Sequence, residues 1–255
     1  PLSVLMLAKI RDILIICDPN QIRNYSNLLG NGSKFGINLK YKVQKKPEGI
    51  AQGIKIAGSF IKNKKCCLIL GDNIFYGSNF ISVLERARLQ LDRGALIFGY
   101  PVNNPEDFGV AYLHGDKVTS IKEKPKNSKS NLAIPGLYFY DENALDYVQK
   151  LRKSKRGEYE ITDLNKIYLK KGLLNIHNLG RGFAWLDTGN HSSLLTASNF
   201  IQTIEDRQDL KVACLEEIAI SNKWLSVDKL RSILKNKPKS SYYEYLRRIA
   251  KDDSI

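Results

Sequence analysis

The chain has 255 residues, 43% of them hydrophobic, and a formal net charge of +14. This length suits one large domain with a buried core, and no apolar run approaches the ~20 residues of a membrane-spanning helix. The four cysteines form no CxxC pair and the three histidines lack metal-ligand spacing, which argues against a disulfide framework and a zinc site. We therefore expect reduced thiols and a cytoplasmic protein.

The basic charge could face nucleic acid, an acidic membrane or phosphorylated small molecules. Much of it is lysine scattered along the chain, as in "KNKK" at 62–65 and "LKNKPK" at 234–239, and this is typical of a solvated surface. No helix-turn-helix signature or aromatic RNA-binding motif accompanies the charge. We therefore expect neither a nucleic acid nor a membrane as a partner.

Strand-like runs alternate with amphipathic segments of helical length through the first part of the chain. The predicted strands are 12–17, 37–44, 66–70 and 94–100, and the predicted helices are 20–30, 48–61 and 78–90. Gly30 and Gly94 stand where glycines that end helices are common. This alternation predicts an α/β fold, Rossmann-like, with a mixed and mostly parallel sheet flanked by helices.

The pattern changes after residue 100. The predicted elements are a β-hairpin at 108–125, a strand at 131–140, helices near 142–151 and 159–171, strands near 173–178 and 183–186, and final helices at 226–236 and 241–251. Pro135 indicates a bulge or an edge in the strand at 131–140. We expect an α/β domain over residues 1–189, and a helical C-terminal region over 190–255 packed on the same domain.

Two aspartates follow apolar runs, Asp72 in "LILGDN" and Asp187 in "FAWLDTGN". Ligands of open parallel sheets bind beyond the carboxyl ends of the strands, and Mg²⁺ commonly takes one or two carboxylates together with phosphate oxygens. Either aspartate alone could equally be a turn or helix-capping residue. The pair together predicts a magnesium site formed by Asp72 and Asp187.

Five motifs occur in order over nearly the whole chain. They are "VQKKPEGIAQG", "LGDNIFYG", "IKEKPKNSKSNLAIPGLYFY", "RGEYEITDLN" and "GRGFAWLDTGNHSSLL". Together they resemble the glucose-1-phosphate thymidylyltransferases. The resemblance implies a Mg²⁺-dependent nucleotidyltransferase that makes dTDP-glucose and pyrophosphate from dTTP and glucose 1-phosphate, the first step of dTDP-L-rhamnose biosynthesis. It also implies a homo-oligomer, a tetramer in relatives.

One feature of the family is absent from this sequence. The family opens with a strand, a glycine-rich GGxGTRLxPxT loop and a later lysine, whereas this sequence starts at "PLSVLMLAKI", which resembles the helix that follows them. Such a loop cradles phosphates with backbone amides. We therefore expect little catalysis and a sheet that lacks its first strand. Two alternatives stay open: a catalytically impaired nucleotide- or sugar-phosphate-binding fragment, and a UTP-preferring sugar-phosphate nucleotidyltransferase.

The resemblance assigns nucleotide binding to Gln44, Pro47, Gly49, Leu70 and Asp72. A glutamine amide has one donor and one acceptor face, which matches the N3–H and O4 of thymine. This pairing does not sense the C5 methyl group. Gln44 therefore cannot by itself separate thymine from uracil.

The resemblance places glucose hydroxyls on Glu123 and the sugar phosphate on Lys124 and Arg156, the latter able to bind it in bidentate fashion. The rest of the implied sugar-phosphate site is Phe108, Gly109, Ile134, Tyr138 and Asp187. Phe108 stands where many relatives have tyrosine, which removes a hydroxyl. A sugar 1-phosphate is already largely ionised near neutral pH, with a second pKa of about 6. The expected catalytic residues are therefore Asp72, Lys124, Arg156 and Asp187, with no general base.

Overall fold

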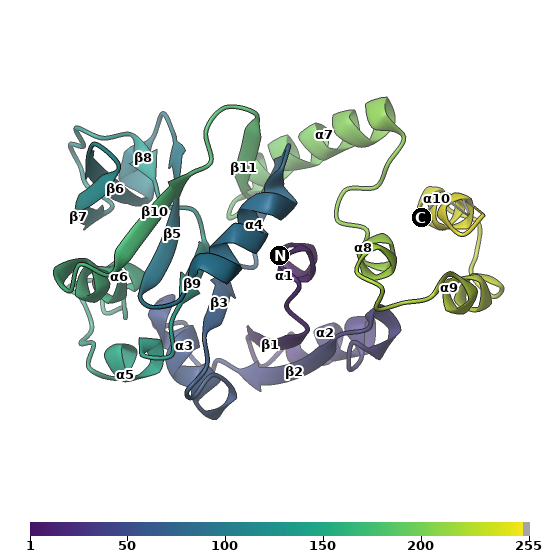
Figure 1. Ribbon diagram of the computed structural model, residues 1–255, viewed down its shortest axis with the longest axis horizontal. Helices are drawn as coiled ribbons and strands as arrows, with labels where there is room; N and C mark the ends of the chain where they lie inside the picture. Colours follow the sequence, from purple (N-terminus) through teal and green to yellow (C-terminus); the bar gives the residue numbers. More distant parts are fainter. Residues whose placement is uncertain (252–255) are drawn as a thin grey trace.

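A mixed sheet with helices on both faces forms the centre of the computed structural model, which describes residues 1–251 (Figure 1). Its strands run in the order β3-β9-β5-β8-β6-β7, and β10 pairs with β5. Two further pairs, β1–β2 and β4–β11, stand beside it. The predicted α/β fold with a mixed, helix-flanked sheet is therefore confirmed.

The strands are β1 (Asp12–Cys17), β2 (Asn38–Val43), β3 (Cys66–Ile69), β4 (Asn73–Gly77), β5 (Ala95–Pro101), β6 (Gly109–His114), β7 (Lys117–Glu123), β8 (Leu132–Ala133), β9 (Leu137–Tyr140), β10 (Leu174–Asn178) and β11 (Phe183–Asp187). The helices are α1 (Leu2–Leu7), α2 (Ile22–Leu29), α3 (Ala51–Ala57), α4 (Phe80–Gln90), α5 (Ala144–Gln149), α6 (Ile161–Lys170), α7 (His191–Gln208), α8 (Leu215–Ser221), α9 (Val227–Leu234) and α10 (Ser241–Ile249). The predicted strand at 12–17 is confirmed with both its ends, and the hairpin at 108–125 is β6 and β7.

The pairing of the strands differs from the mostly parallel sheet that we expected. Within residues 1–251 only β1–β2 and β5–β10 are parallel, and the other pairs are antiparallel. The main cause is β9, which lies between β3 and β5 and runs opposite to both. The single strand expected at 131–140 is also divided, because Ile134, Pro135 and Gly136 separate β8 from β9.

Side chains of β5 and β9 alternate between two hydrophobic clusters, as the pleat of a strand requires. Ile97 and Tyr138 pack with α3, α5 and α6 on one face. Phe98 and Phe139 pack with α1 and α4 on the other. Because both faces are covered, β9 is buried along its whole length, and Pro135 marks the bend before a central strand rather than an edge.

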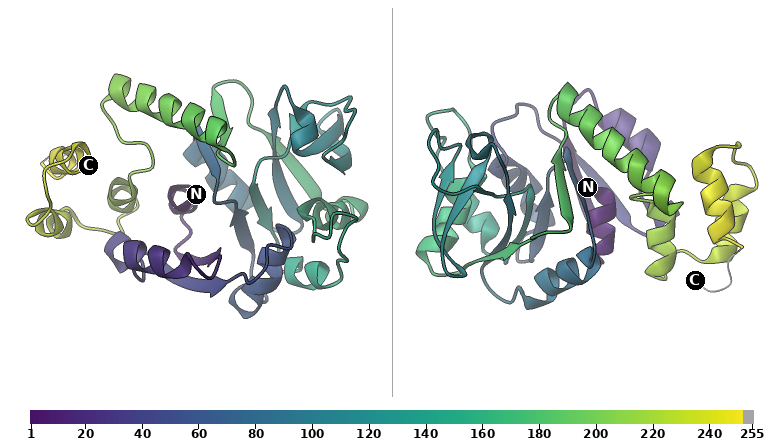
Figure 2. Two further views of the ribbon diagram at one scale, coloured as in Figure 1. Left: turned by 180° about the vertical axis from the view of Figure 1, so that it is seen from behind. Right: turned by 90° about the horizontal axis from the view of Figure 1, so that it is seen from above.

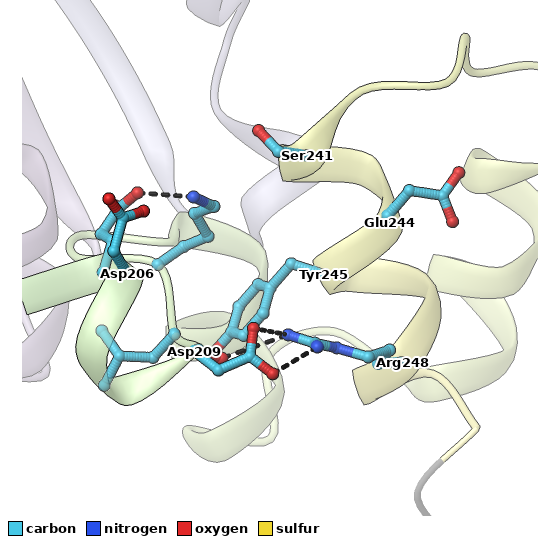
Figure 3. Close-up of a pocket in the computed structure, with 9 residues that line it drawn as sticks. Asp206, Asp209, Ser241, Glu244, Tyr245 and Arg248 are labelled. Atoms are coloured by element: carbon cyan, nitrogen blue, oxygen red, sulfur yellow. Dashed lines mark hydrogen bonds and ion pairs between the residues drawn. The ribbon is translucent and has the colours of Figure 1, made fainter. Parts of the chain in front are cut away.

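Helices α8, α9 and α10 form a third cluster with α1, β1 and β2. Met6, Leu230 and Leu246 are almost completely buried in it. The aromatic helix α10 thus docks on its own chain, and Arg248 donates from its two terminal guanidinium nitrogens to the Asp209 carboxylate, at 2.5 and 2.9 Å. Figure 3 shows this ion pair beside a cavity of about 400 Å³ between α7 and α10. Of the predicted helical region, residues 252–255 lie outside the described residues.

Helix α7 connects the sheet to these C-terminal helices (Figure 2). It begins with a capping box, in which Asn190 and Ser193 bind each other's backbone and side chain. Ala197 is its one buried residue. Along residues 1–251, no helix combines the length and the apolar character needed to cross a membrane.

The β1–β2 pair does not hydrogen-bond to the main sheet among the described residues. A cavity of about 650 Å³ separates the two and is lined by side chains of β1, β2, α3 and β3. The β1–β2 pair therefore stands apart from β3, the end strand of the main sheet.

The two glycines expected to end helices have different roles. Gly30 caps α2 with φ of 62°, as predicted. Gly94 also has a positive φ, of 105°, but α4 ends earlier, at Gln90. A Cβ at Gly94 would lie 2.3 Å from the carbonyl oxygen of Leu173. Gly94 therefore permits the close approach of the chain that leads into β10, and the helix-end prediction for it is wrong.

Asp141 immediately follows β9 and is fully buried. Its carboxylate accepts hydrogen bonds from Gly94 N, the Tyr168 hydroxyl and the Asn143 backbone and side chain at 2.7 to 3.1 Å. Burial by itself would raise the pKa of Asp141, but the hydrogen bonds from Tyr168, Gly94 and Asn143 outweigh it and lower that pKa.

Replacing Asp141 by asparagine should lower the free energy of unfolding at neutral pH by about 1 to 3 kcal/mol, because an NH₂ group would face a buried donor. Since the folded pKa lies below the unfolded value of about 3.9, ionised Asp141 stabilises the fold above about pH 4. This contribution is lost as the pH falls through the folded pKa. Urea unfolding between pH 3 and 7 should show this loss of stability at low pH for the parent and for Asp116→Asn, which changes an exposed turn residue and serves as the control. Asp141→Asn should not show it.

Candidate active site

Asp72 and Asp187 lie together at one end of the β4–β11 pair. Asp187 is the last residue of β11 and pairs with Asn73, the first residue of β4. Thr188 secures the junction, because its backbone N–H and its hydroxyl both donate to the carbonyl oxygen of Asp72, at 2.8 and 2.9 Å. A Cβ added to Gly189 would lie 3.1 Å from Asp187 Oδ1 and 3.7 Å from Asp72 Oδ2. The two carboxylates therefore border the same small space.

This space suits a hard divalent cation, since both side chains offer carboxylate oxygens. In the described part of the chain, His, Cys, Asp and Glu form no group of three or more that could hold a metal ion. A cation here would thus take its further ligands from water and from a substrate phosphate, which is the usual environment of Mg²⁺.

The residues expected to contact the sugar meet next to Asp72. Ile134 N donates to the carbonyl oxygen of Gly109 at 2.8 Å. The Glu123 carboxylate accepts a hydrogen bond from the Thr162 hydroxyl, and its Oε2 lies 3.3 Å from the position that a Cβ of Gly109 would occupy. Burial, and then the charges of Glu123 and Asp72, raise the pKa of the Tyr138 hydroxyl. The structure therefore brings Gly109, Glu123, Ile134 and Tyr138 together.

Phe108 contacts an aromatic residue that sequence analysis did not single out. Its ring centroid lies 5.0 Å from that of Trp185, and the Trp185 indole N–H donates to Asn73 Oδ1 at 2.7 Å. The sequence indicates Trp185 only as part of "GRGFAWLDTGNHSSLL" and Asn73 only as part of "LGDNIFYG". Thr162 was likewise missed. In the sequence, an indole or hydroxyl of a binding site cannot be distinguished from one in the hydrophobic core. Only the tertiary contacts identify these residues.

The two predicted phosphate-binding cations differ in their surroundings. The Arg156 guanidinium lies 3.7, 3.2 and 3.5 Å from carboxylates of Glu123, Glu158 and Glu160. The Lys124 ammonium has no ion-pair partner among residues 1–251, and the backbone of Lys124 adopts a φ of 40°. Non-glycine residues rarely adopt this conformation, and such strain gathers at functional sites.

The predicted nucleotide-binding loop follows β2. Gln44 Nε2 donates to Gln52 Oε1 at 2.6 Å, and the Gln52 amide also binds the backbone and side chain of Glu48. Pro47 lies exposed at the bend of this loop. Within residues 1–251, neither Gln44 nor Pro47 forms a hydrogen bond with Asp72 or Asp187. The loop is therefore preorganised but separate from the carboxylate pair.

Two predicted residues link this loop and the carboxylates to the rest of the fold. Gly49 has a φ of 102°, and a Cβ there would lie 2.5 Å from the carbonyl oxygen of Tyr159. Leu70, just before Asp72, donates from its backbone N–H to the carbonyl oxygen of Gly136 at 2.9 Å. Its side chain fills the space where Gly136 lacks a Cβ. Leu70 therefore aligns the end of β3 with the start of β9.

The cysteines next to this region do not provide a nucleophile. Burial raises the pKa of Cys66 to about 12 and raises that of Cys67 as well. Both thiols stay protonated at neutral pH. The chemistry of the site thus depends on carboxylates and cations.

Comparisons with known proteins agree with this arrangement. A family model described as "Nucleotidyl transferase" matches residues 1–204. A glucose-1-phosphate thymidylyltransferase from Neisseria meningitidis is 50% identical over 252 residues, which cover 98% of this chain and 87% of that relative. The chain belongs to the glucose-1-phosphate thymidylyltransferase family of nucleotidyl transferases.

Other members of the family are similar over the same length. One from Xanthomonas campestris is 49% identical and covers 100% of this chain and 86% of its own. A Bacillus anthracis protein of this description, solved in complex with a sucrose, superposes with a TM-score of 0.71 at 38% identity, over 78% of this chain and 79% of that one. A UDP-glucose pyrophosphorylase complexed with UDP-glucose shares the fold, with a TM-score of 0.66 at 19% identity.

Replacing Gly49 by alanine should distort the predicted nucleotide-binding loop, because the new Cβ would overlap the Tyr159 backbone and the positive φ is strained. We expect dTTP affinity to fall at least tenfold by calorimetry, and the melting temperature to fall as well. Gly30→Ala is the matched control, since Gly30 also has a positive φ but no atom lies within 4 Å of the added Cβ. Equal effects of the two substitutions on dTTP affinity would contradict the role assigned to Gly49.

Proposed function

We propose that this chain transfers a thymidylyl group from dTTP to glucose 1-phosphate, releasing pyrophosphate and forming dTDP-glucose with the help of Mg²⁺. The observation that carries this proposal is the meeting of Asp72 and Asp187 near Glu123 and Tyr138. The names of relatives at 43 to 50% identity support the choice of substrates.

The reaction needs placement and charge neutralisation more than proton transfer. A sugar 1-phosphate is largely ionised at neutral pH, so its oxygen can attack the α-phosphorus of dTTP directly, in line with the leaving pyrophosphate. Lys124 and Arg156 hold the sugar phosphate, and Asp72 and Asp187 would hold the cation. Mg²⁺ bound there would neutralise the charge that develops on the transferred phosphoryl group.

Arg156 and Glu123 also fit the sugar phosphate as a pair. Arg156 is exposed and forms ion pairs with three carboxylates rather than a bidentate bond with one. A phosphate can therefore bind its guanidinium in bidentate fashion. Glu123 is held on one oxygen by Thr162, which leaves its other oxygen to accept from a sugar hydroxyl. Arg156 would thus bind the charged phosphate of the ligand, and Glu123 would bind its neutral sugar.

The nucleotide end of the ligand would bind at the loop after β2. Gln44 is half-buried and its amide is oriented by Gln52, so a base can meet both an acceptor and a donor there. Because the amide does not sense the thymine methyl group, selection of dTTP over UTP must come from contacts with that methyl group or with the 2′ position of the sugar. UTP is therefore the informative competing substrate.

The test is pyrophosphate release by the chain from dTTP, glucose 1-phosphate and Mg²⁺, with UTP in parallel and dTDP-glucose binding measured on the same samples. Release should need both substrates and should fall at least about 100-fold in Asp72→Asn, since a cation ligand contributes several kcal/mol. Asp116→Asn, in the exposed turn between β6 and β7, should behave like the parent.

The possible results separate the alternatives. Faster release from UTP would replace dTTP by UTP in the proposal. Binding of dTDP-glucose without any release would reduce the chain to a nucleotide-sugar-binding protein. Absence of both binding and release would contradict the proposed function as a whole.

A further inference from the structure

The side-chain amide of Asn73 joins three parts of the site. Asn73 is only 3% exposed. Its Oδ1 accepts the backbone N–H of Gly136 at 2.9 Å and the indole N–H of Trp185 at 2.7 Å. Its Nδ2 donates to Asp72 Oδ1 at 2.8 Å. One buried side chain thus touches the carboxylate pair, the start of β9 and the aromatic ring next to Phe108.

These contacts fix which way the amide faces. Gly136 N–H and Trp185 Nε1–H can only donate, so both need the carbonyl oxygen of Asn73. A rotated amide would place its NH₂ group against two buried donors and leave all of them unpaired. The NH₂ group of Asn73 must therefore face Asp72.

This orientation determines which oxygen of Asp72 is available. Asp72 Oδ1 accepts the hydrogen bond from Asn73, which is strengthened by the charge of the carboxylate. Asp72 Oδ2 is the oxygen that faces Gly189. The position of a Cβ added to Gly189 would lie 3.7 Å from this oxygen and 3.1 Å from Asp187 Oδ1. Rotation of the Asp72 side chain away from this point would break its bond to Asn73.

We propose that Asn73 is a positioning residue, which turns Asp72 Oδ2 toward Asp187 and ties this geometry to Gly136 and Trp185 on the sugar side. The inference rests on the proposed cation-binding role of Asp72 and Asp187. Asn73 touches neither substrate nor cation in this account, and its effect on the cation passes through Asp72.

The test is binding of Mn²⁺ alone to the purified chain, followed by the electron paramagnetic resonance signal of the free ion. Asp72→Asn defines the part of the binding that belongs to the carboxylate pair. In Asn73→Ala the dissociation constant of that part should rise about tenfold. Asn165→Ala is the matched control, because Asn165 is 1% exposed and binds the Tyr140 hydroxyl, away from the carboxylate pair. Its Mn²⁺ affinity should stay within twofold of the parent.

A second substitution keeps the test decisive if Asn73→Ala does not fold. In Asn73→Ser the shorter hydroxyl can still accept one of the two N–H groups but cannot reach Asp72, so the same loss of affinity is expected. Parent-like Mn²⁺ affinity in a folded Asn73 variant, or an equal loss in Asn165→Ala, would overturn the positioning role. A parent without Asp72-dependent Mn²⁺ binding would instead overturn the cation site itself.

Discussion

The antiparallel pairing of β4 with β11 is the interaction on which the site depends. Asp72 immediately precedes β4 and Asp187 ends β11, so the register that pairs Asn73 with Asp187 decides whether the carboxylates meet. A shift by one residue would turn every side chain of a strand to the opposite face. The bonds from Thr188 to Asp72 and from Trp185 to Asn73 oppose such a shift, and they join residues more than a hundred positions apart.

The second constraint is the buried strand β9. It lies between β3 and β5, and Gly136, the residue just before it, is hydrogen-bonded to both Leu70 and Asn73. Tyr138, on the same strand, therefore stands at a fixed place between Asp72 and Glu123. The hydrophobic clusters on the two faces of β9 hold this strand in place. The packing of the core thus sets the place of Tyr138 relative to the carboxylate pair.

Much of this could be predicted from local patterns. The strand at 12–17 and the hairpin at 108–125 have strong local signals, alternating or apolar runs and a turn. The pairing of β4 could not be predicted, because "NIFYG" acquires its strand geometry from β11, in which Asp187 pairs with Asn73. The meeting of Asp72 and Asp187 was predicted from two parallel strand ends, whereas an antiparallel ladder achieves it. Asn73 and Thr162 were missed because buried amides and hydroxyls give no signal until their partners are known.

The central claim is that Asp72 and Asp187 share one cation near Glu123 and Tyr138. The most direct measurement is anomalous diffraction from crystals of this chain grown with Mn²⁺ and dTDP-glucose. The account predicts an anomalous peak within ligand distance of Asp72 Oδ2 and an Asp187 oxygen, with the glucose next to Glu123. A nucleotide sugar bound at Gln44 and Glu123 with no peak between the two aspartates, or with a peak elsewhere, would contradict it.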